Sequence, residues 1–75
     1  MKKKKSYAVI ARYIGSWHEL RDWGIWYRWG RFRDEAAANM AKDALTRNHG
    51  QRYEFRVVPS DFDIRAENKR TKDAV

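Results

Sequence analysis

Few residues in this 75-residue chain have the types and spacing that catalysis needs. His18 and Asp22 stand four positions apart and would share one face of a helix. A histidine with one carboxylate supplies neither a nucleophile nor a set of metal ligands, and the chain has no Cys/His spacing of a zinc site. We therefore expect a protein that is not an enzyme and that has no catalytic residues, no metal and no cofactor.

Arginine and tryptophan side chains offer a binding chemistry instead. Guanidinium groups bind phosphate or guanine edges with two hydrogen bonds, and an indole ring stacks on a base. The strand periods given below place four arginines, one tryptophan and one glutamate on one face of a sheet. These residues are Arg12, Trp26, Arg28, Arg52, Glu54 and Arg56. This face is the predicted nucleic-acid site. A solvated sheet face, or one buried against another protein chain, explains the same residues.

Two further tryptophans, Trp17 and Trp23, lie in the nine-residue segment from Gly15 to Trp23. They either fold back as a lid on the core, which is the commoner outcome, or form a patch that binds a partner. The run Ser16-Trp17-His18-Glu19 fits a capping box, so the segment can contain one helical turn.

The net charge of +7 is concentrated at the two ends of the chain. Lys2, Lys3, Lys4 and Lys5 supply four of the positive charges, and residues 65–75 supply two more. Residues 6–64 therefore carry a net charge of only +1. Both ends are polar and are expected to be flexible tails that attract any polyanion. Solubilising ends are the alternative explanation.

Size and composition indicate one small, soluble domain. A chain of this length buries only about 60% of its unfolded surface, and the large rings that make up 15% of the residues compensate for a thin core. The chain has no cysteine, which suits a reducing compartment, and no apolar run approaches membrane-spanning length. We expect a soluble, cytoplasmic protein.

Two strands are predicted before the main helix. Residues 7–14 are rich in β-branched and aromatic side chains and are apolar on both faces, as in a central strand. Residues 24–29 form the second strand, with Trp26 and Arg28 on one face and Ile25, Tyr27 and Trp29 on the other. Tyr27 and Trp29 are assigned to the core.

A capped helix and a returning strand follow. Asp34 is the expected N-cap, Glu35 lies in the first turn, and Gly50 follows the last one. An apolar stripe made mostly of alanine lets the helix approach the sheet closely. Residues 53–58 then alternate as a third strand that Pro59 ends.

These elements predict an α+β fold, with a three-stranded antiparallel sheet, one helix packed on one face and the order ββαβ. The expected organisation is a disordered basic tail over 1–5, a single domain over 6–60 and a flexible basic tail over 61–75. The sheet face opposite the helix would then remain uncovered.

The stretch Gly30-Arg31-Phe32-Arg33-Asp34, with Ala38, Ala41 and Asp43 after it and Gly50 at its close, resembles part of the AP2-type and integrase arm-type DNA-binding domains. The resemblance implies that a sheet presents Arg and Trp to the DNA major groove. On that analogy the contacting positions are Arg12, Trp26 and Arg28. The chain departs from the pattern because only two strands precede its helix and one follows it.

The chain also resembles, in size and aromatic content, the small ββαβ proteins encoded by bacteriophages and prophages, whose ends often read like Arg56-Val57-Val58-Pro59. This resemblance implies a small accessory protein in the cytoplasm of a bacterial host cell. We expect it to bind nucleic acid, with DNA favoured over RNA, through the sheet face and tails. The alternatives are an inhibitor that binds a host protein and a structural protein that self-associates through a free sheet edge. No membrane partner is expected, and the chain would be a monomer or weak homodimer.

Overall fold

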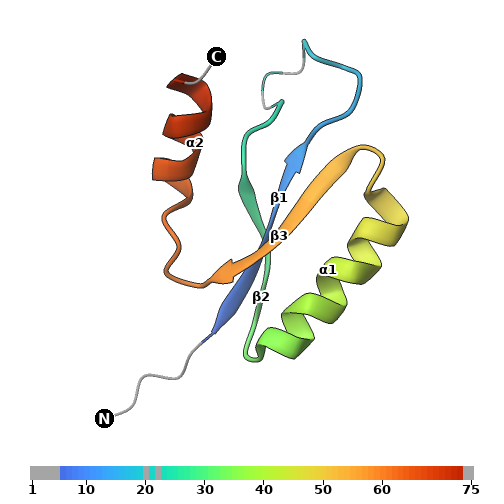
Figure 1. Ribbon diagram of the computed structural model, residues 1–75, viewed down its shortest axis with the longest axis vertical. Helices are drawn as coiled ribbons and strands as arrows, with labels where there is room; N and C mark the ends of the chain where they lie inside the picture. Colours follow the sequence, from blue (N-terminus) through green and yellow to red (C-terminus); the bar gives the residue numbers. More distant parts are fainter. Residues whose placement is uncertain (1–5, 20, 22, 74–75) are drawn as a thin grey trace.

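The computed structural model describes residues 6–19, 21 and 23–73 (Figure 1). Its elements follow the chain in this order: β1 (Tyr7–Tyr13), β2 (Tyr27–Phe32), α1 (Glu35–His49), β3 (Tyr53–Pro59) and α2 (Ile64–Asp73). The strands form one antiparallel sheet with the spatial order β2-β1-β3. The predicted α+β fold and its ββαβ order are therefore confirmed, and a second helix is added.

Strand β1 lies in the middle of the sheet because both of its faces are apolar. Val9 and Ile10 are adjacent in the chain, and both side chains are fully buried, one on each face. Strand β3 pairs with β1 in an uninterrupted register that runs from Tyr7 opposite Pro59 to Tyr13 opposite Tyr53.

Helix α1 covers one face of the sheet. Asp34 precedes it in an extended conformation, and Gly50 follows it with its N–H donated to the Thr46 carbonyl at 2.8 Å, so both predicted ends are confirmed. Asp34 marks the start by its backbone, since its side chain accepts no capping hydrogen bond. Ala38 is fully buried, and its small side chain brings the helix backbone close to the sheet.

Helix α2 lies on the opposite side of the sheet (Figure 1), where the sequence predicted an uncovered face and a flexible tail over 61–75. Asp63 begins the helix, because its Oδ1 accepts the Ala66 N–H at 3.0 Å. Phe62 and Ile64 pack against a second core. That core consists of Ala8, Ile10, Trp26 and Val58. The sheet therefore has an apolar layer on each face.

Strand β2 begins three residues later than the predicted start at Gly24. Its pairing with β1 contains a bulge, since Arg28 lies opposite Ile10 and Gly30 lies opposite Val9, which leaves Trp29 without a partner residue. The segment before β2 contains turns and one isolated bridge between Tyr13 and Trp23, and no helical turn among its described residues. Leu20 and Asp22 lie outside the described residues.

Candidate functional site

Trp26, which the sequence placed on an exposed binding face, is buried. Only 3% of its surface is exposed, and it packs with Ile10 and Val58 beneath α2. The Arg12 guanidinium lies 4.7 Å from the centroid of its ring and the Arg56 guanidinium lies 5.7 Å from it. Trp26 therefore has a structural role as the platform of two cation–π contacts, and its ring is not available for stacking on a base.

Arg12 is committed to a contact within the protein. Its Nε donates to Glu54 Oε1 at 2.8 Å, and its Nη2 lies 2.6 Å from the same oxygen. The two residues are cross-strand neighbours on β1 and β3. A guanidinium that is held by a carboxylate and by an indole ring has less capacity for a phosphate.

The other predicted binding residues are exposed. Arg28 on β2 and Arg56 on β3 both lie opposite Ile10 of β1, so they share the α2 side of the sheet with Arg12, as the strand periods predicted. Arg52 lies in the turn that follows α1. The loop tryptophans are also exposed, with 59% of Trp17 and 38% of Trp23 accessible. These fractions do not fit the expected lid. Lys2, Lys3, Lys4 and Lys5 lie outside the described residues.

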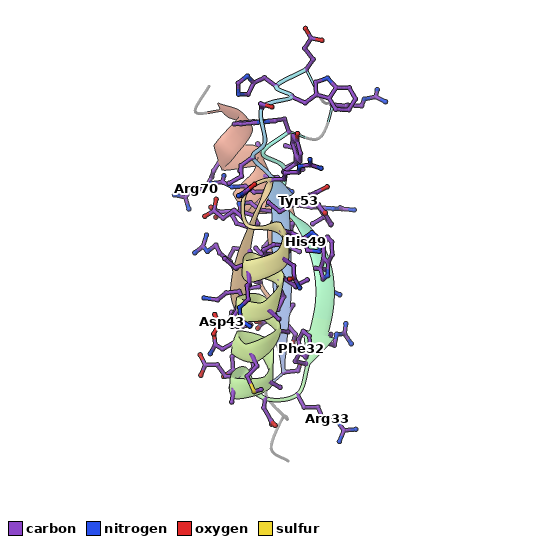
Figure 2. All side chains as sticks on the ribbon, turned by 90° about the vertical axis from the view of Figure 1, so that its right-hand side faces the viewer. Phe32, Arg33, Asp43, His49, Tyr53 and Arg70 are labelled. Atoms are coloured by element: carbon purple, nitrogen blue, oxygen red, sulfur yellow. The ribbon has the colours of Figure 1, made fainter. Side chains whose placement is uncertain are left out.

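Exposed rings gather where the sequence predicted core. Tyr27 and Trp29 on β2 are 40% and 44% exposed. Their ring centroids lie 6.0 Å apart, and Trp29 also contacts His49 at 6.4 Å and Tyr53 at 6.2 Å. We call these four residues, Tyr27, Trp29, His49 and Tyr53, the aromatic edge. Figure 2, which looks onto α1, shows His49 and Tyr53 on the side of α1 that faces β2.

The aromatic edge is exposed because α1 does not extend over β2. The helix packs through Ala38, Ala41 and Leu45 on a core that belongs mainly to β1 and β3. The bulge places Trp29 and Gly30 next to each other on the α1 side, and Gly30 has no side chain to cover the indole. Trp29 is supported from below by Phe55, whose ring meets it edge-on at 5.5 Å and 89°.

The surroundings of Tyr27 on this surface change its ionisation. Partial burial, and in addition the neighbouring Tyr53, raises the pKa of Tyr27 above its ordinary value of 10.0. Tyr27 therefore stays neutral through the physiological pH range.

A hollow of about 570 Å³ lies at the end of α1 next to the aromatic edge. Its lining consists of Thr46, Arg47, Asn48, His49, Gly50, Gln51 and Arg52. Two of these residues are arginines, and none of the described lining residues is an aspartate or a glutamate. His49 belongs both to the hollow and to the aromatic edge, so the two features adjoin.

Sequence reasoning missed this site because alternation shows which face a residue occupies but not whether anything covers it. Tyr27 and Trp29 were correctly placed on the α1 face. One signal was available: the glycine that follows Trp29 in an edge strand, which is typical of a bulge.

Comparison with protein-family models, with curated proteins and with solved structures gives no match to this chain. Within the described part of the chain, neither α1 nor α2 is long and apolar enough to span a bilayer.

Proposed function

We propose that this protein acts by binding single-stranded nucleic acid, DNA in the first place, on the aromatic edge. The observation that carries the proposal is the exposure of Tyr27 and Trp29 as a tilted pair of rings on an edge strand. Stacking of successive bases on such rings is the common way in which proteins hold single strands without reading their sequence. The bases of a duplex are paired and stacked on each other, so they cannot stack on Tyr27 and Trp29. The proposal therefore names a single strand, whose bases are free to do so.

Exposed arginines supply the complementary charge. Arg47 and Arg52 line the hollow beside His49. Neither forms an ion pair with another described residue. A nucleic-acid strand that follows the aromatic edge would therefore meet these two arginines at the His49 end of the edge, whereas Arg28 extends on the opposite face of the sheet.

The experiment is fluorescence anisotropy of labelled single-stranded DNA, duplex DNA and RNA over a salt series, with the intact chain and with a chain that lacks residues 1–5. The proposal expects the shortened chain to prefer the single strands to the duplex. It expects a salt dependence that corresponds to a few phosphate contacts. If all binding is lost with residues 1–5, the folded domain is not the nucleic-acid site.

A host protein is the second candidate partner, and the exposed loop favours it. Trp17 and Trp23 lie on one loop with the His18 ring 5.3 Å from the Trp23 ring, and Trp23 Nε1 donates to the Gly15 carbonyl at 2.8 Å. Exposed tryptophans anchor many protein interfaces. A desolvated interface of this kind weakens far less with salt than phosphate binding does.

The resemblance to small bacteriophage proteins fits either partner. Under this proposal the protein is an accessory factor in a bacterial cell, which holds a single strand rather than transforming it. Helix α2 has a structural role in that account, because it covers the core around Trp26.

A further inference from the structure

The hollow at the end of α1 and the exposed face of Trp29 form one continuous surface. Trp29 lies 6.4 Å from the His49 ring, and His49 lines the hollow. The base and the phosphate of one nucleotide are joined through a single sugar, so a site for both must place a ring and an anion pocket side by side. Trp29 and the hollow have this arrangement.

The hollow favours an anion. Arg47 and Arg52 line it, and neither has a carboxylate partner among the residues the structure describes. Planar guanidinium groups bind phosphate oxygens with pairs of charge-assisted hydrogen bonds. The polar side chains of Thr46, Asn48 and Gln51 add hydrogen-bonding groups to the same lining.

The end of a helix carries partial negative charge on its free carbonyl groups, which opposes anion binding. Two of these carbonyls are already occupied here. The Thr46 oxygen accepts the Gly50 N–H at 2.8 Å, and the His49 oxygen accepts the Arg52 N–H at 3.0 Å. Arg47 and Arg52 thus add two full positive charges to a helix end of which two carbonyls are already hydrogen-bonded, so the cations dominate the local charge.

We propose that the hollow formed by residues 46–52 is the phosphate subsite of a nucleotide whose base stacks on Trp29. This inference rests on the proposed function and deepens it: the ligand unit is one nucleotide of a single strand, held by its base and by its phosphate. Arg47 and Arg52 bind the phosphate, and Trp29 with Tyr27 holds the base.

The test uses adenosine monophosphate, adenosine and inorganic phosphate, titrated separately into the ¹⁵N-labelled protein and followed by NMR. Both adenine ligands should shift the Trp29 indole signal. The monophosphate and inorganic phosphate, but not adenosine, should shift the amide signals of residues 46–52. One pair of charge-assisted hydrogen bonds corresponds to roughly tenfold tighter binding of the monophosphate than of adenosine.

The variant Arg47→Gln with Arg52→Gln should reduce the affinity for the monophosphate to that for adenosine, while the affinity for adenosine stays the same. Arg33→Gln is the matched control, since Arg33 is also exposed but lies at the opposite end of α1 from His49 (Figure 2). The control should bind both ligands as the unchanged protein does.

Three results would overturn the subsite. They are equal affinity of the unchanged protein for the two adenine ligands, no shift at residues 46–52 with the monophosphate, and an equal loss in the Arg33→Gln control. Binding of a single-stranded oligonucleotide, measured on the same samples, distinguishes failure of the phosphate subsite from failure of the proposed function. If the oligonucleotide still shifts the Trp29 signal, only the phosphate subsite fails; if it does not, the proposed function fails as well.

Discussion

The side-chain amide of Asn68 on α2 makes two hydrogen bonds to the backbone of Trp26. Its Oδ1 accepts the Trp26 N–H at 2.7 Å, and its Nδ2 donates to the Trp26 carbonyl at 2.9 Å. The amide thus pairs with the residue before β2 much as a neighbouring strand would. Asn68 fixes α2 to the sheet at the point where the Trp26 side chain enters the core.

Replacing Asn68 by alanine should destabilise the protein by about 1–3 kcal/mol, because two half-buried backbone groups of Trp26 lose their partners. Urea unfolding followed by circular dichroism measures this loss. Asn39→Ala is the matched control, since Asn39 is exposed on α1. Equal unfolding midpoints for the two variants would contradict the role of Asn68.

Gly24 should tolerate asparagine better than alanine. Its φ angle is +75°, in the left-handed region, and a Cβ atom added there would meet no atom within 4 Å outside the neighbouring residues. The cost of Gly24→Ala is therefore backbone strain alone, about 1–2 kcal/mol, and Gly24→Asn should cost less because asparagine enters this region more readily. Urea unfolding of both variants measures the difference. An unchanged midpoint for Gly24→Ala is the opposing result.

The raised pKa of Tyr27 predicts a specific loss of stability at alkaline pH. The folded protein holds the Tyr27 proton more tightly than the unfolded chain does. This contribution is therefore complete below pH 10.0 and is lost as the pH rises through the higher folded-state value. The Tyr27→Phe variant should lose less stability between pH 10.0 and the folded-state pKa of Tyr27. Urea unfolding at a series of pH values measures it, and parallel decreases in both proteins would refute the assignment.

The sheet edges predict a protein that does not self-associate. Strand β2 carries Arg28 and Arg31 and is interrupted by the bulge at Trp29, and β3 ends in Pro59, which has no N–H to donate. Sedimentation should therefore give a monomer at every concentration in moderate salt. The Arg28→Thr, Arg31→Thr variant should associate more readily. A dimer of the unchanged protein that grows with concentration would favour the structural alternative.

Local signals were enough to predict most of the fold. The ends of α1 at Asp34 and Gly50 are confirmed, because the residue types that begin and end helices are local signals, although the Asp34 side chain makes no capping hydrogen bond. The alternation of residues 53–58 gave β3, and the two apolar faces of residues 7–14 correctly indicated a central strand.

The missed features depend on contacts between distant residues. Helix α2 has a polar sequence with no clear apolar stripe, and it is fixed by Phe62, Ile64 and Asn68 against Trp26. Its usable signal was Asp63 as an N-cap before a run of good helix formers. The burial of Trp26 follows from the presence of α2. The exposure of Trp29 follows from the bulge and from the path of α1. The alternation of apolar and polar residues along a strand predicts neither of them.

The most direct test of the account is the affinity of a labelled single-stranded oligonucleotide for Trp29→Ala and Trp17→Ala, measured by fluorescence anisotropy. Trp17 is the more exposed of the two and lies outside the aromatic edge, so it is the matched control. Circular dichroism on the same samples confirms that both variants are folded. Loss of one stacked base predicts binding that is weaker by roughly tenfold or more for Trp29→Ala, and unchanged for Trp17→Ala. Unchanged affinity of a folded Trp29→Ala variant would contradict the account.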